Sequence, residues 1–133
     1  MSQIGIQENP FTTVYPAGAT PINASSGNVA ASAAVATLAG VAGKTTYITG
    51  FEITASGATV GLVVNATVVG TISGTFTYAY AAMAGALLIN TPLVVAFPMP
   101  IPASAENTAI VITLPALGIG NTSACVVAHG FQL

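Results

Sequence analysis

Charged side chains are almost missing from this sequence. Of its 133 residues, 3% are charged, with one Lys, three Glu and neither Arg nor Asp, whereas about 25% are charged in ordinary soluble domains. Binding to nucleic acid requires several cationic side chains that neutralise phosphates, so we expect no nucleic-acid partner. A surface with so little charge gives weak repulsion between molecules, and it is tolerable where partners bury much of it.

The sequence also has a single cysteine and no unbroken apolar segment of membrane-spanning length, and each of these limits the class of protein it can be. The single cysteine, Cys125, excludes an internal disulfide, so packing alone has to hold the fold. The best candidate for a membrane span, residues 79–97, is broken by Asn90, Thr91 and Pro92 and has no basic flank. We therefore expect no membrane span, in spite of a mean hydropathy of +0.84. The first ten residues lack the basic and apolar regions of a secretory signal.

Short β patterns, by contrast, fill the chain from residue 28 onward. Runs rich in β-branched and aromatic residues alternate with clusters of Gly, Pro, Asn and Ser, which is the pattern of strands and turns. The expected strands are 29–38, 46–55, 59–69, 72–80, 86–89, 92–97, 107–114 and 123–132. Strict alternation along 46–55 predicts Ile48 and Glu52 on one face and Phe51 on the other. Proline alternates over residues 97–102, so this segment is expected to run extended along a sheet edge or between two sheets. About eight short strands predict an all-β domain over 28–133, a two-sheet β-sandwich or jelly roll.

The last two expected strands, 107–114 and 123–132, suggest a hairpin. The segment that joins them contains Pro115, Gly118 and Gly120, which are turn residues. Alternate residues of a strand face opposite ways, and neither face of 123–132 is properly polar. One face carries Cys125, Val127, His129, Phe131 and Leu133, and the other Ala124, Val126, Ala128 and Gln132. A strand of this kind is expected to be covered on both sides, which favours self-association, and we predict a symmetric homotrimer.

Residues 1–27 differ from the rest of the chain. Proline and glycine recur too often for a long strand or a helix, but the segment also contains large apolar side chains. We predict an extended N-terminal arm, which packs either on its own domain or on a partner. The residues expected to contact a partner are Phe11, Val14, Tyr15 and Pro16 of the arm, together with His129.

No group of residues predicts catalysis. Cys125 and His129 share a strand face, but four residues at about 3.3 Å each separate them by about 13 Å, which is too far for a thiol–imidazole pair. Glu8, Glu52 and Glu106 are scattered along the chain. One His, one Cys and these carboxylates supply no recognisable ligand cluster for a metal. We therefore assign no catalytic residue, no metal site and no cofactor.

His129 is expected to be structural. We predict a buried, neutral, hydrogen-bonded ring on the face that carries Cys125 and Phe131, either in the core or at a subunit contact. Charging a buried imidazole is unfavourable unless a carboxylate is nearby, so acid is expected to weaken the contact. The alternative is an exposed His129 that binds a metal at a three-fold axis.

Five aromatic residues present two alternatives. They could line a platform for a sugar, or they could be core residues, which is the commoner outcome at strand spacing. These residues are Tyr47, Phe51, Phe76, Tyr78 and Tyr80.

Four segments resemble small virion proteins of tailed bacteriophages and prophages. They are 41–52 (VAGKTTYITGFE), 98–110 (PMPIPASAENTAI), 118–122 (GIGNT) and 128–133 (AHGFQL). The resemblance covers residues 28–133 and is structural, because these motifs contain no catalytic signature. It implies a non-enzymatic β-sandwich subunit of the virion, a capsid decoration (cement) protein that forms trimers on the major capsid protein at the capsid surface. The alternative is a head-fibre, tail or baseplate module that binds host-surface carbohydrate.

Overall fold

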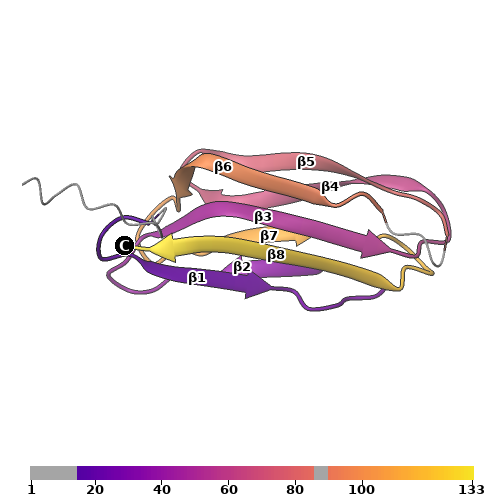
Figure 1. Cartoon of the computed structure of the whole chain (residues 1–133), viewed down its shortest axis with the longest axis horizontal. Coiled ribbons are helices and arrows are strands. Elements are labelled where there is room, and N and C mark those ends of the chain that lie inside the picture. Colours follow the sequence, from indigo (N-terminus) through magenta and orange to yellow (C-terminus); the bar gives the residue numbers. More distant parts are fainter. Residues whose placement is uncertain (1–14, 86–89) are drawn as a thin grey trace, which may run out of the picture.

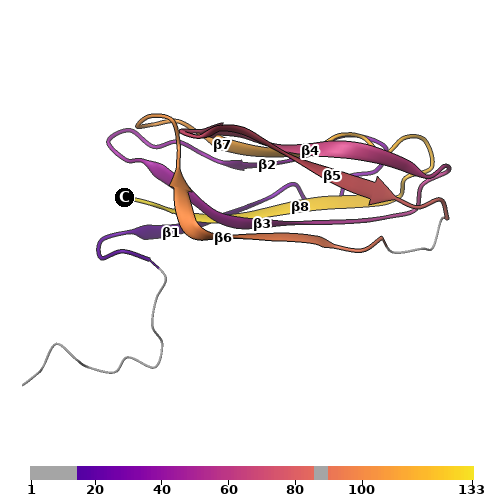
Figure 2. The same ribbon diagram turned by 90° about the horizontal axis from the view of Figure 1, so that it is seen from above.

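Two antiparallel sheets of four strands form the molecule. The computed structural model describes residues 15–85 and 90–133, in which there are eight strands and no helix. Sheet A has the order β1-β8-β3-β6 and sheet B the order β2-β7-β4-β5. The two sheets form the two layers that are visible in Figures 1 and 2. The strands are β1 (Thr20–Ser25), β2 (Ala34–Leu38), β3 (Thr46–Ser56), β4 (Leu62–Thr71), β5 (Gly74–Ala82), β6 (Leu93–Pro102), β7 (Ile110–Leu114) and β8 (Ser123–Gln132).

This strand order is that of a jelly roll, so the predicted all-β sandwich is confirmed. Each sheet turns one face inward, and alternate residues of every strand form the core between the sheets. In β7, for example, Ile110, Ile112 and Leu114 are buried, while the residues between them are partly exposed. Phe51, Ile53 and Val126 meet them from sheet A. Apolar burial on this scale is the main stabilising contribution to a fold without disulfides.

The predicted terminal hairpin is wrong. β7 lies in sheet B between β2 and β4, whereas β8 lies in sheet A between β1 and β3. The connection between them therefore crosses from one sheet to the other and closes one end of the core, where Leu117 is buried. Asn121 anchors this connection, because its side chain donates to the carbonyls of Ser56 and Ser123 and accepts from the Ala31 amide.

The boundary expected between arm and sandwich, at 27/28, lies too late in the chain. β1 falls inside the expected arm and pairs with β8 along its whole length, from Thr20 opposite Gln132 to Ser25 opposite Val127. Pro21 is tolerated because β1 is an edge strand, in which one side of the backbone needs no partner. Residues 1–14, including Phe11 and Val14, lie outside the described residues.

Other strand boundaries shift by a few residues. The expected strand 29–38 shortens to β2, and Val29 makes only an isolated bridge to Ala124. The expected strand 86–89 lies outside the part of the chain that the structure describes. β6 continues through the proline-rich segment to Pro102 and forms an edge of sheet A. An edge position was one of the two predicted for this segment, because proline has no backbone N–H to donate to a neighbouring strand.

Candidate functional site on the outer face of sheet A

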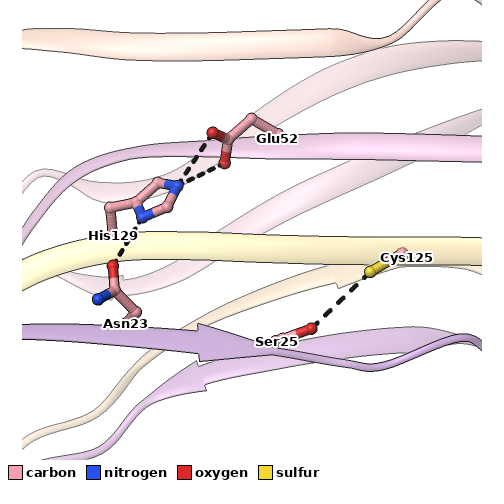
Figure 3. A network of polar contacts seen from close by, with 5 residues as sticks. All are labelled: Asn23, Ser25, Glu52, Cys125 and His129. Atoms are coloured by element: carbon pink, nitrogen blue, oxygen red, sulfur yellow. Dashed lines mark hydrogen bonds and ion pairs between the residues drawn. The ribbon is translucent and has the colours of Figure 1, made fainter.

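A polar network crosses three neighbouring strands on the outer face of sheet A (Figure 3). His129 lies on β8, with Asn23 of β1 on one side and Glu52 of β3 on the other. Its Nδ1 lies 2.7 Å from Asn23 Oδ1, and its Nε2 lies 2.7 Å from Glu52 Oε2 and 3.0 Å from Oε1. The network thus holds the edge strand β1 and the inner strand β3 to the central strand β8.

A β-bulge places Glu52 within reach of His129. The pairing of β3 with both of its neighbours shifts between Ile48 and Gly50. Ile48 faces the core before the bulge, while Phe51 and Ile53 face it afterwards, so Glu52 turns outward. The strict alternation expected for 46–55 is therefore wrong, because a bulge inserts one residue and reverses the facing of those that follow. Glycine is required at Gly50, where a Cβ would lie 2.6 Å from the Val95 carbonyl oxygen.

His129 is not buried, contrary to the expectation. Its side chain and that of Glu52 are each 38% exposed. Both ring nitrogens face oxygen acceptors, so an imidazolium can donate to Asn23 and to the Glu52 carboxylate together. The expectation that acid weakens a contact at His129 rested on a buried ring, and the exposure of the ring removes that premise.

The network leaves His129 without a free nitrogen for general-base chemistry. Cys125, on the same face of β8, contacts Ser25 instead, with its sulfur 3.8 Å from the Ser25 hydroxyl oxygen (Figure 3). Nucleophilic catalysis requires a base within hydrogen-bond reach of the nucleophile, and the arrangement of His129 does not provide it. Within residues 15–85 and 90–133, no group of three or more His, Cys, Asp or Glu side chains is placed to hold a metal ion.

An aromatic cluster lies beside the network. Phe131 is buried on the outer side of β8, stacked on Tyr47 at a centroid distance of 4.7 Å and in edge contact with Tyr15 at 5.6 Å. The chain at Tyr15 therefore packs on its own sandwich, which is one of the two alternatives left open for the arm. Pro16 is exposed, and its carbonyl accepts from the Ala19 amide in a turn.

The other four aromatic residues of the supposed sugar platform belong to the interior. Phe51 and Tyr80 are buried, and Phe76 and Tyr78 pack against the core cluster. Phe51 contacts Tyr78 edge to face at 5.3 Å. Burial raises the pKa of the Tyr78 and Tyr80 hydroxyls, because desolvation disfavours the phenolate. Their expected role as core residues is confirmed.

Sheet B has an outer face of a different kind. None of its four strands contains Asp, Glu, Lys, Arg or His. Thr113, Thr67 and Thr77 lie side by side across β7, β4 and β5, and Val35 of β2 continues this row. Val63 and Val69 of β4 are exposed on the same face. The large apolar side chains exposed over the whole described surface are Val35, Val41, Val60, Val63, Val69, Ile72, Met83, Val94, Met99, Ile119 and Leu133.

Sequence reasoning identified His129 but not its partners. Glu52 was expected to face the same way as Ile48, and Asn23 was assigned to the arm. Gly50 was the available signal, because an isolated glycine in a strand pattern often marks a bulge.

Comparison with protein-family models, with curated proteins and with solved structures finds no match to this chain. The described residues contain no helix that is long and apolar enough to cross a membrane.

Proposed function

We propose that the protein is a non-enzymatic structural subunit of a tailed-phage particle, a decoration protein that binds and stabilises the assembled head shell. In this proposal it acts as a homotrimer on the capsid surface, with the major capsid protein as its partner. The proposal combines the resemblance of residues 28–133 to small virion proteins with the character of the molecular surface. Fold alone does not decide the matter, since jelly rolls occur in viral capsid and lectin domains alike.

The observation that carries the proposal is the outer face of sheet B. Exposed apolar side chains on an uncharged face suit contact with another macromolecule. Here Val35, Val63 and Val69 are exposed among threonine and asparagine side chains, and the four strands carry no charge. We assign this face to the shell. Sheet A is less suited to that role, because its outer face carries the network of Asn23, His129 and Glu52.

A non-enzymatic role is consistent with the same network. Both nitrogens of His129 are engaged, and Cys125 lies in a separate contact with Ser25. The residues that looked most reactive in the sequence thus connect strands of sheet A in the structure. The alternative function, binding of host-surface carbohydrate by a fibre, tail or baseplate module, gains little support from aromatic residues that are mostly packed in the core.

Two measurements on the purified protein test the proposal. Light scattering after size-exclusion chromatography should give the mass of a trimer, and sedimentation with undecorated phage heads should show saturable binding to the shell. A monodisperse monomer at micromolar concentration would refute the oligomer, and a stable dimer would refute the trimer. Retention on a host-glycan array without binding to heads would favour the carbohydrate alternative.

A further inference from the structure

The four strands at the sheet edges are not protected equally. A free edge exposes backbone N–H and C=O groups that can pair with another chain, and proteins usually block it with proline, charge or short length. β6 contains Pro98, Pro100 and Pro102, β1 contains Pro21 within six residues, and β2 has five residues. β5 has nine residues and contains neither proline nor charge. It is therefore the one long, unblocked edge among the described strands.

The surroundings of β5 fit an added strand. β5 and β6 lie along the same long side of the sandwich (Figures 1 and 2), and half-buried Phe76, Tyr78 and Phe97 lie on this side. A cavity of about 280 Å³ adjoins the C-terminal end of β5 and is lined by residues that include Met83, Pro92 and Leu93. Recognition of an extended peptide by an edge strand combines backbone hydrogen bonds with pockets for alternate side chains.

Two buried polar atoms near this cavity have unused hydrogen-bonding capacity. Asn90 is 1% exposed, and its Oδ1 accepts from the Met83 amide at 2.7 Å, which fixes the carboxamide. Its Nδ2 and the Tyr80 hydroxyl have no hydrogen-bond partner. Both residues line the cavity. Buried polar groups are usually satisfied, so these two atoms show that the sandwich is incompletely packed at this end of β5.

We propose that the free edge of β5 receives the N-terminal segment, residues 1–14, of a second copy of this chain as an added strand. In the sequence of this segment, Ile4 and Ile6 alternate with Gln3, Gly5 and Gln7, which is the pattern of a half-buried strand. Its one charged side chain is Glu8, so it brings almost no charge to an uncharged edge.

Chain length favours a neighbouring copy over the same copy. The described chain starts at Tyr15, which packs on Phe131 near β1, whereas β5 lies on the opposite side of the sandwich. Fourteen residues span at most about 50 Å. Crossing three strand spacings and one sheet spacing takes about 24 Å and leaves about 26 Å of arm, which is less than the roughly 30 Å of the nine residues of β5. Within its own copy an arm can therefore pair with only part of the β5 edge, whereas an arm from a neighbouring copy need not make this crossing.

This inference rests on the proposed function in one respect, because it takes the protein to be an assembly subunit. An arm that docks on the next copy makes a heterologous contact, and contacts of this kind close into rings when the rotation permits. The homotrimer on the shell would then be a ring of exchanged arms.

Complementation between two full-length variants tests the exchange. The first, Thr77→Lys with Ala79→Lys, places charge on the β5 edge but keeps the arm. The second, Ile4→Asp with Ile6→Asp, alters the arm but keeps the edge. Each variant alone should require at least tenfold more protein than the wild type to associate in mass photometry, and an equimolar mixture should form 1:1 heterodimers. The matched controls are Val35→Lys with Thr37→Lys on the β2 edge and Gln3→Asp with Gln7→Asp on the other face of the arm, and both should associate like the wild type.

Disulfide capture keeps the test decisive if the lysine variant fails to fold. In a Cys125→Ser background, a chain carrying Ile6→Cys and a chain carrying Ala79→Cys should form an intermolecular disulfide on mild oxidation. The proposal is overturned if the arm variant associates like the wild type, if the mixture remains monomeric, or if no cross-link forms. Because all these measurements are made without phage heads, loss of arm exchange and loss of shell binding are separate outcomes.

Discussion

The outer faces of the two sheets differ in chemistry, although both belong to one sandwich. On sheet A the polar side chains of Asn23, His129 and Glu52 are paired with one another across neighbouring strands. On sheet B the outward side chains are mainly Thr, Val and Ala, with no ionisable group. The comparison teaches that one sandwich can carry a polar network that connects its own strands on one face and an uncharged surface on the other, which is why the proposed shell contact is assigned to sheet B.

The largest loss of stability is expected from Gly130→Ala, because an added Cβ would disturb the pairing of β8 with β3. The network of Asn23, His129 and Glu52 on sheet A depends on that pairing. A Cβ at Gly130 would lie 2.0 Å from the Tyr47 carbonyl oxygen, in the strand next to β8. Because backbone must move to accommodate it, we expect the free energy of unfolding to fall by about 3 kcal/mol in urea titrations. Gly61→Ala is the control, since a Cβ there would meet its nearest atom at 3.6 Å. Equal stability of the two variants would contradict the argument.

The next largest effect is expected on binding to phage heads, which we assign to the outer face of sheet B. Val63 on sheet B and Val94 on sheet A are 67% and 66% exposed, so they form a matched pair. We expect Val63→Lys to weaken binding to phage heads at least tenfold, or about 1.4 kcal/mol, because it places a charge in an apolar contact. Val94→Lys should change binding less than threefold. Sedimentation with heads measures both, and a stronger effect of Val94→Lys would transfer the shell contact to sheet A.

The third prediction concerns Tyr80, whose side chain faces the core from sheet B and not its outer face. The Tyr80 hydroxyl is buried without a partner, so its removal should be neutral or stabilise the fold by up to about 1 kcal/mol. Burial raises the Tyr80 pKa in the folded protein. The unfolded chain therefore loses this proton first, and stability declines as the pH rises above about 10. Urea titrations at neutral and alkaline pH should show a smaller decline for the variant, and an unchanged decline would be evidence against this account.

The smallest effect on stability is expected from substitutions of His129 and Glu52 in the sheet A network. His129 and Glu52 are half-exposed, so solvent weakens their attraction, and we expect a coupling energy of about 0.5 kcal/mol. A double-mutant cycle with Glu52→Gln and His129→Gln measures it at low salt, and high salt should reduce it. Strictly additive single effects at low salt would show that the pair contributes nothing to stability.

The strands and their connections were predicted from the sequence more accurately in some parts of the chain than in others. The bounds 123–132 agree with β8, because β-branched residues fill the whole segment and turn residues precede it. β1 was missed since proline and glycine on either side of Thr20–Ser25 obscure a short strand. The hairpin prediction failed because turn residues indicate a reversal of the chain but do not specify in which sheet the next strand lies.

The candidate site was less predictable than the fold. His129 stood out as the one residue of its type, but its partners Asn23 and Glu52 are remote in sequence and meet only when β1 and β3 flank β8. The bulge at Gly50 also reverses the facing of Glu52. Such contacts depend on strand register across the sheet, which local alternation does not reveal.

The central position of β8 also governs the order in which the chain can fold. β8 is the last strand in the sequence, yet it separates β1 from β3 in sheet A. Thr20 near one end of the described chain faces Gln132 near the other, so sheet A closes a long loop with its entropic penalty. A fold rich in such distant pairings forms slowly. During synthesis β3 can pair with β6, but β1 has no partner in sheet A until β8 is made, so the growing chain passes through an incomplete sheet with unpaired edges, which is the kind of species that is prone to aggregation.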